Sequence, residues 1–222
     1  MKQIALDLGL ETGPSFERFF PGSNQEVLFC LEKTVAEKSP VPVYLWGPES
    51  SGKTHLLKSV QTAFNEINQT VGWLSPETDK LQPFNPQWSA ILMDDVHLYG
   101  PALQQHAFAW FIHATQNNTV IVSAGNAPPM NLPLRDDLRS RMGWGQIYAL
   151  HPLNDNDCRI AMQNAAKTRG FHLPDDVLDY LLLHFSRDLG SLMQLLDMMD
   201  KYGLETKRAI TIPFINAMMQ ES

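Results

Sequence analysis

The stretch Gly47-Pro48-Glu49-Ser50-Ser51-Gly52-Lys53-Thr54 decides the fold of this chain. It matches the phosphate-binding pattern G-x-x-x-x-G-K-[ST], in which glycines let backbone N–H groups close around a phosphate. We expect these eight residues, together with His55, to line a nucleotide site. Lys53 would reach the β- and γ-phosphates, and the Thr54 hydroxyl would hold Mg²⁺. The alternative is an ordinary glycine-containing turn between a strand and a helix.

The segments on either side suit such a loop. Residues 43–46, Val-Tyr-Leu-Trp, form a short apolar run that is typical of a buried strand. After the loop, apolar residues recur at helical spacing from Leu56 to Ile67. The N-terminus of that helix would face the phosphates, because its backbone N–H groups and its dipole favour an anion.

Strand and helix patterns alternate over the first two thirds of the chain. Further apolar runs that predict strands lie at 71–74, 90–93, 120–123 and 146–150. Helical spacing occurs at 24–38, 101–116 and 134–142. This alternation predicts an α/β fold with a parallel sheet between helices.

The pattern changes after Pro152, where only helices are expected. Their ranges are about 154–169, 175–186, 189–202 and a last helix from Pro213. We therefore expect an N-terminal segment over residues 1–13, an α/β nucleotide-binding domain over 14–152 and a small all-α domain over 153–222.

Composition and charge argue against free duplex DNA, disulfide bonds and a membrane as features of this protein. The chain has 222 residues, of which 44% are apolar, which is enough for a substantial core. It carries 17 Lys and Arg against 24 Asp and Glu, a net charge of −7, which argues against free duplex DNA as the main ligand. Cys30 and Cys158 lie in helical patterns and are interpreted as reduced, buried thiols. The sequence has no signal-peptide pattern and no apolar run of membrane-spanning length, so we expect a cytoplasmic protein with no membrane partner.

Asp94 and Asp95 directly follow the apolar run at 90–93. A carboxylate at the end of such a strand would order Mg²⁺ through water, which makes Thr54 and Asp94 the candidate metal ligands. The neighbouring carboxylate could polarise an attacking water. The alternative is a pair of strand-end carboxylates in a turn.

The order of these segments resembles an AAA+ ATPase module, and their details are similar to the DnaA family of replication initiators. The similar segments are 16–19, 22–24, 45–48 and 138–145. The resemblance covers residues 14–220 and implies an AAA+ P-loop fold followed by an all-α lid domain, with ADP or ATP and Mg²⁺ as cofactors. The initiators continue into a helix-turn-helix that reads DNA, whereas this sequence stops at Ser222. That combination resembles the DnaA-related proteins that inactivate the initiator, and 150–153 and 209–214 are similar to them too.

The resemblance also implies roles for individual residues. Arg141 matches the arginine finger that reaches into the nucleotide site of a neighbouring DnaA. Arg187 matches the sensor 2 arginine, which contacts the phosphates of the chain's own nucleotide. Asn126 or Ser123 would lie near the sensor 1 position, where this sequence lacks the acidic residue usual in DnaA.

The N-terminal stretch Gln3-Ile4-Ala5-Leu6-Asp7-Leu8 resembles the peptide that binds the DNA polymerase sliding clamp. Gln3 would form a hydrogen bond at the rim of a pocket, while Ile4, Leu6 and Leu8 would enter apolar clefts. The alternative is a first β-strand, or a terminus in which apolar residues simply alternate.

Three functions fit this set of features. The favoured one is a negative regulator of replication initiation that is tethered to the DNA-loaded clamp and stimulates ATP hydrolysis by DnaA through Arg141. Such a co-activator would have weak or no turnover of its own, would contact DNA only indirectly, and would be homo-oligomeric and associated with the replisome at the nucleoid. The alternatives are an AAA+ ATPase or loader that acts through its own ATP hydrolysis, and an adaptor without effect on hydrolysis. The sequence leaves the physiological nucleotide and the oligomeric state open.

Overall fold

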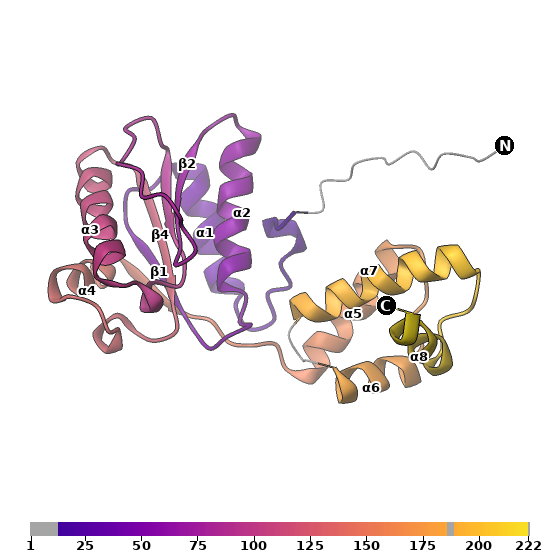
Figure 1. Cartoon of the computed structure of the whole chain (residues 1–222). Coiled ribbons are helices and arrows are strands. Elements are labelled where there is room, and N and C mark those ends of the chain that lie inside the picture. The colour runs from indigo at the N-terminus through magenta and orange to yellow at the C-terminus, as the bar shows by residue number, and fades with distance from the viewer. Residues whose placement is uncertain (1–12, 186–188, 222) are drawn as a thin grey trace. The chain divides into compact units, whose positions relative to one another are not determined.

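The structure, a computed structural model, describes residues 13–185 and 189–221. The contacts divide the chain into two compact units, which are taken in turn (Figure 1). The first unit comprises residues 13–19, 25–47 and 52–150. The second comprises residues 20–24, 48–51 and the described residues from 151 onward.

The first unit is built on a five-stranded sheet in the order β2-β3-β4-β1-β5. Its strands are β1 (Val43–Trp46), β2 (Val71–Leu74), β3 (Ala90–Met93), β4 (Val120–Gly125) and β5 (Gln146–Ala149). Every pairing is parallel. The predicted parallel sheet is therefore confirmed, and β1, which precedes the phosphate loop, lies inside it between β4 and β5.

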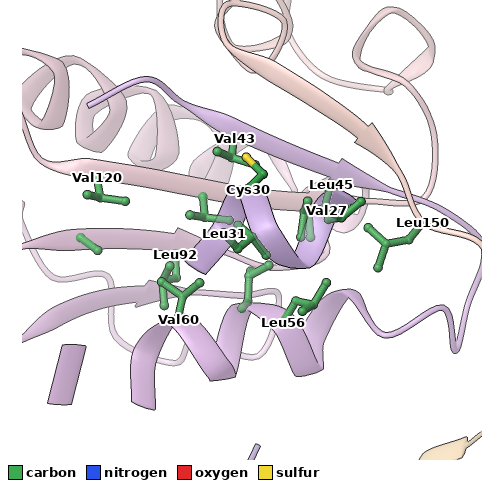
Figure 2. Close-up of a cluster of buried hydrophobic side chains, with 14 of the residues drawn as sticks. Val27, Cys30, Leu31, Val43, Leu45, Leu56, Val60, Leu92, Val120 and Leu150 are labelled. Atoms are coloured by element: carbon green, nitrogen blue, oxygen red, sulfur yellow. The ribbon is translucent and has the colours of Figure 1, made fainter. Parts of the chain in front are cut away.

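Helices cover both faces of this sheet (Figure 1). Helices α1 (Gln25–Glu37) and α2 (Lys53–Glu66) pack on the face to which Val43 and Leu45 point (Figure 2). Helices α3 (Pro101–Gln116) and α4 (Asp136–Met142) pack on the opposite face, where Tyr44 points. Burial on both faces explains why β1, β3 and β4 appear in the sequence as continuous apolar runs rather than as alternating patterns.

Three short 3₁₀ turns complete the first unit: η1 (Phe16–Arg18), η2 (Val96–Leu98) and η3 (Pro129–Asn131). The predicted helix at 134–142 begins later than expected, at Asp136. Leu134 is buried in the core next to α3 but lies outside the helix. Its apolar character therefore comes from a loop that packs inward, which periodicity alone cannot distinguish from a first helical turn.

The second unit consists of helices α5 (Asp155–Thr168), α6 (Asp175–His184), α7 (Leu189–Thr206) and α8 (Ile212–Glu221). The side chain of Asn154 caps α5 by accepting a hydrogen bond of 2.9 Å from the N–H of Asp157. The four helices share one apolar core that includes Leu178, Leu196 and Ile215, all fully buried. The predicted small helical domain is thus confirmed as an all-α unit.

Two further predictions concern membranes and cysteines. No helix in residues 13–185 or 189–221 is both long and apolar enough to cross a membrane. Cys30 and Cys158 are buried, as predicted, and their thiols are not joined in a disulfide.

Candidate nucleotide site

The loop over residues 47–54 connects the end of β1 to α2, which begins at Lys53. Two of its residues have left-handed backbone: Ser50 with φ of 59° and Gly52 with φ of 94°. A Cβ atom on Gly52 would lie only 2.8 Å from Cε2 of Phe19. Both the backbone conformation and the close ring therefore require glycine at this position. The first turn of α2 follows directly, and such a turn offers backbone N–H groups to an anion.

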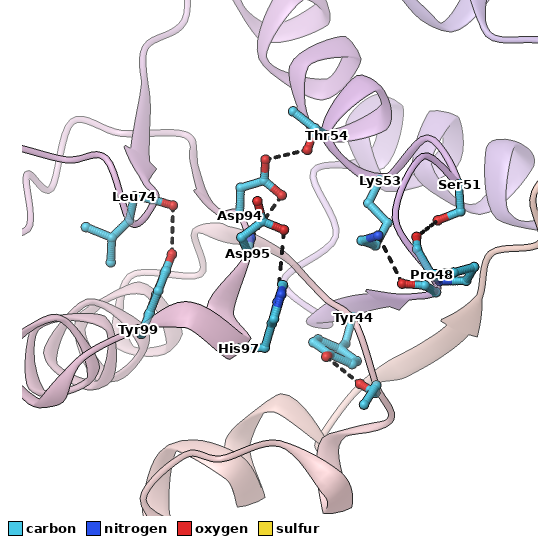
Figure 3. Close-up of polar contacts among 12 residues, drawn as sticks. Tyr44, Pro48, Ser51, Lys53, Thr54, Leu74, Asp94, Asp95, His97 and Tyr99 are labelled. Carbon is cyan, nitrogen blue, oxygen red and sulfur yellow. Dashed lines mark hydrogen bonds and ion pairs between the residues drawn. The ribbon is translucent and has the colours of Figure 1, made fainter. Parts of the chain in front are cut away.

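The loop folds around its own lysine. Lys53 is only 7% exposed, and its Nζ donates a hydrogen bond of 3.0 Å to the carbonyl oxygen of Gly47 (Figure 3). The hydroxyl of Ser51 donates one of 2.9 Å to the carbonyl oxygen of Pro48. Because a buried ammonium gains most from a charged partner, a phosphate bound in this loop would suit Lys53.

Thr54 and Asp94, the two predicted magnesium ligands, lie side by side. The Thr54 hydroxyl donates a hydrogen bond of 2.7 Å to Oδ2 of Asp94 (Figure 3). The N–H of Asp95 donates one of 3.0 Å to Oδ1 of Asp94. Asp95 itself has left-handed backbone, with φ of 47°. A positive φ is uncommon for a residue other than glycine, and the Asp95 side chain is half-exposed.

The environment of Asp94 favours a cation. Burial raises the pKa of its carboxyl group, and the nearby negative charge of Asp95 acts in the same direction, while the hydrogen bond from Thr54 and the charge of Lys53 oppose them. Tyr99, whose hydroxyl donates a hydrogen bond of 2.7 Å to Leu74, has a pKa well above its usual range because of burial and of both aspartates. A divalent cation would stabilise the ionised form of Asp94.

The donor set suits Mg²⁺ held together with a nucleotide. Magnesium in such sites takes one or two protein ligands and completes its octahedron with water and phosphate oxygens. In the described part of the chain, no group of three or more His, Cys, Asp and Glu side chains could hold a metal by itself. The adjacent oxygens of Thr54 and Asp94 provide the one or two protein ligands that Mg²⁺ needs when a nucleotide supplies the others.

His97 is a neighbour of this site that the sequence did not reveal. Its Nδ1 lies 4.0 Å from Oδ1 of Asp95 (Figure 3). Within the described residues this buried nitrogen has no hydrogen-bond partner. The 3₁₀ turn η2 brings the two side chains together, and the spacing Asp-Val-His carries no signal from which that turn could have been predicted.

The two candidates for the sensor 1 position differ in exposure. Ser123 is buried inside β4, with its hydroxyl 3.2 Å from the sulfur of Met142. Asn126 is exposed and directly follows β4. Since β4 lies between β1 and β3, Asn126 is at the same edge of the sheet as Lys53 and Asp94.

The remaining predicted residues are His55, the exposed residues of the loop itself and residues outside the described part of the chain. The ring of His55 packs against Phe19 in a tilted arrangement with ring centroids 5.6 Å apart, and its Nε2 is 3.1 Å from the carbonyl oxygen of Ser15. Pro48, Glu49 and Ser50 are exposed. Gln3, Ile4, Leu6, Leu8 and Arg187 fall outside the described residues.

Arg141, the predicted finger, is half-buried on α4. Its guanidinium carbon lies 4.4 Å from the ring centre of Trp144 and 5.3 Å from that of Phe108. The structure therefore groups Arg141 with aromatic rings and not with the phosphate loop or Asp94.

A parallel sheet in this strand order, a phosphate loop after β1, paired aspartates after β3 and a following helical unit define an AAA+ fold. The chain belongs to the bacterial DnaA ATPase-domain family, whose family model matches residues 10–149. The family model of the Hda lid domain matches residues 155–219. This is a DnaA-related AAA+ protein with an Hda-type lid.

Solved structures agree with this fold. Domain III of the replication initiation protein DnaA from Thermotoga maritima is similar, with a TM-score of 0.77 and 19% identity over 99% of this chain and 98% of that one. AMPPCP-bound DnaA from Aquifex aeolicus has a TM-score of 0.71 and 20% identity over 90% and 69% of the two chains. The Holliday junction branch migration motor RuvB from Thermotoga maritima has a TM-score of 0.62 and 16% identity over 89% and 67%.

Proposed function

We propose that this protein is a negative regulator of DNA replication initiation, which stimulates ATP hydrolysis by the initiator DnaA. The observation that carries this proposal is the combination of a DnaA-type ATPase domain with a lid of the Hda type. In this proposal, residues 14–152 form the nucleotide-binding domain and residues 153–222 form the lid.

Arg141 is the residue that would act on the partner. A guanidinium supplied in trans neutralises charge that develops on the transferred phosphoryl group, and such fingers accelerate hydrolysis by about 10³–10⁵-fold in other systems. Within the described residues, Arg141 forms no ion pair with a carboxylate of its own chain. Its N–H groups are therefore not committed to an internal acidic partner.

The chain's own nucleotide would set its conformation and assembly. ADP or ATP would bind along residues 47–55, with Asn126 near the phosphates and Arg187 contacting them from the lid. AMPPCP in the similar Aquifex aeolicus DnaA supports an adenine nucleotide. Thr54 and Asp94 would hold Mg²⁺, which supplies positive charge to the phosphates when bound, and Asp95 would polarise a water.

We also propose where the protein acts and what it binds. Gln3, Ile4, Leu6 and Leu8 would bind the sliding clamp, so that DNA is contacted only through the clamp and DnaA. The protein would work in the cytoplasm at the replisome, as a homo-oligomer.

Phosphate release in a reconstituted mixture tests this proposal. The purified protein is measured alone, then with DnaA, and then with DnaA, the clamp and DNA. We expect little release by the protein alone and a large increase only when all components are present. Rapid release by the protein alone, with no further increase on adding DnaA, would refute the proposal.

That second outcome would favour an ATPase or loader that uses its own ATP. One observation supports this candidate: a hydrogen bond of 2.7 Å joins Thr54 and Asp94, the two residues that would hold Mg²⁺ in a hydrolytic centre. Lys53 and Asp95 lie in the same site. Replacing Lys53 by Ala would abolish release in that case and would leave a finger acting in trans at least partly active.

A further inference from the structure

Three aromatic rings surround the guanidinium of Arg141, and we call them the aromatic cage: Phe108, Phe111 and Trp144. The guanidinium carbon lies 4.4 Å from the ring centre of Trp144, 5.3 Å from that of Phe108 and 5.8 Å from that of Phe111. All three distances are within the range of a cation–π interaction, and Trp144 offers the strongest ring.

Backbone geometry fixes Trp144 at this place. Helix α4 ends at Met142, and the N–H of Trp144 donates a hydrogen bond of 3.1 Å to the carbonyl oxygen of Arg141. Phe108 and Phe111 come from α3, where Phe111 is fully buried. Trp144 is 60% exposed, so it contributes little to the core. Of the three rings, that of Trp144 lies closest to the guanidinium of Arg141.

The other two arginines of this segment form ion pairs, although the guanidinium carbon of Arg135 also lies 5.4 Å from the ring centre of Phe108. Arg135 forms an ion pair of 2.8 Å with Asp137, and Arg139 forms one with Asp136. In the described parts of the chain, Arg141 has no such partner. A guanidinium in an ion pair must give up a charge-assisted hydrogen bond before it can bind a phosphate. A guanidinium held through its face keeps its five N–H donors available.

We propose that Trp144 is a positioning residue for Arg141. Trp144 holds the flat face of the guanidinium, so that the N–H edge is directed toward a phosphate of the neighbouring molecule's nucleotide. The side chain of Arg141 is thereby partly ordered before the neighbour docks, and less conformational entropy is lost when the complex reaches its active geometry. This inference rests on the proposed role of Arg141 as a finger acting in trans.

Two substitutions separate the π contact from simple packing. Trp144→Leu keeps an apolar side chain and removes the ring, whereas Trp144→Phe keeps a ring. Each variant is titrated, as the full-length chain with clamp and DNA, against DnaA that carries labelled ATP. The single-turnover rate at saturation and the half-saturating concentration are both measured, so that rate and docking are determined independently.

We expect Trp144→Leu to lower the saturating rate by about three- to thirty-fold, which is the range that cation–π interactions account for. The half-saturating concentration and the melting temperature should stay close to those of the unmodified protein. Trp144→Phe should recover most of the rate. An unchanged rate in Trp144→Leu would overturn the inference, and so would a loss that appears only as weaker half-saturation, because Trp144 would then be a docking contact.

A spectroscopic measurement tests the same contact without DnaA. The side-chain protons of Arg141 should show upfield ring-current shifts in the NMR spectrum of the protein alone, and Trp144→Leu should remove most of that shift. Arg139, which is ion-paired, serves as the internal control. Loss of stimulation in Arg141→Ala together with full stimulation in Trp144→Leu would refute this inference alone. Full stimulation in Arg141→Ala would refute the proposed function instead.

Discussion

Replacement of Gly52 by Ala should perturb the candidate nucleotide site through backbone strain and through a close contact with Phe19. Gly52 has φ of 94° and ψ of 9° at the start of α2. A residue with a Cβ atom in the left-handed region costs about 1–2 kcal/mol. The added Cβ would also lie 2.8 Å from Cε2 of Phe19, so that this ring would have to move. The loop can avoid both penalties in the free protein only by leaving the conformation that surrounds Lys53.

The strain then reappears when the nucleotide restores the original loop. Since about 1.4 kcal/mol corresponds to a tenfold change in affinity, 1–2 kcal/mol predicts a loss of about five- to thirty-fold in affinity for Mg-ADP. Isothermal titration calorimetry measures this change. An affinity within twofold of the unmodified protein would refute the reasoning that the left-handed backbone at Gly52 shapes the site.

Gly170 provides a matched control. It has φ of 85°, and a Cβ atom there would meet nothing within 4 Å. Gly170→Ala should therefore impose a similar backbone strain, with a fall of about 1–2 kcal/mol in unfolding free energy, and should leave the affinity for Mg-ADP unchanged. A loss of affinity in this control would show that strain acts through general destabilisation.

Three other changes have definite expected outcomes. Asp94→Asn should abolish the Mg²⁺-dependent tightening of ADP binding without lowering the unfolding free energy, because burial raises the pKa of Asp94 and makes its charge unfavourable without a cation; Asp95→Asn, measured by the same calorimetry, should keep the Mg²⁺ effect. Burial lowers the pKa of His55 in the folded protein. The contribution of neutral His55 to the unfolding free energy is therefore present above its ordinary pKa of about 6.5 and is lost as the pH falls through the lower folded pKa. Urea unfolding should show this decline in stability, and a pH dependence that is unchanged in His55→Gln would contradict the prediction. Leu196→Ala should lower the unfolding free energy of the helical unit by about 2–5 kcal/mol, whereas Leu204→Ala, at a site 73% exposed, should change it by less than about 0.5 kcal/mol.

Much of the fold followed from local sequence patterns. The predicted ranges of β1, β2, β3 and α3 agree with the structure, because buried strands of a parallel sheet leave continuous apolar runs and Pro101 marks a helix start. Where the predicted ranges differ from the structure, contacts between residues distant in sequence determine where the element ends. β4 continues past Ser123 to Gly125 because Gly125 pairs with Trp46 and leaves room for the hydroxyl of Tyr44, which a Cβ atom would approach to 2.3 Å.

Helix ends in the second unit also differ from the predicted ones. We predicted that α6 would extend to Ser186 and that α7 would end near Tyr202, but α6 ends at His184 and α7 continues to Thr206. Glycine is usually unfavourable inside a helix, so Gly203 would be expected to end α7. Here it lies within α7 opposite Phe214, where a Cβ atom would be in ordinary contact at 3.9 Å. Packing in the core therefore outweighs the local preference for a stop.

The candidate site was predictable where a motif exists and not elsewhere. The phosphate loop predicted Lys53 and Thr54, and the strand end predicted Asp94, which the structure places next to Thr54. His97 and the aromatic cage could not be predicted. Phe108 reaches Arg141 from a different helix, and no sequence pattern encodes that contact.

We propose that Arg141 completes the active site of a neighbouring DnaA, and one comparison of two variants tests this role most directly. Arg141→Ala and Arg139→Ala remove the same charge from the same helix, but Arg139 is ion-paired with Asp136. With DnaA carrying labelled ATP, the clamp and DNA, we expect Arg141→Ala to lower the single-turnover rate by about 10³-fold or more, and Arg139→Ala to change it little. Equal rates for Arg141→Ala and the unmodified protein would contradict the claim.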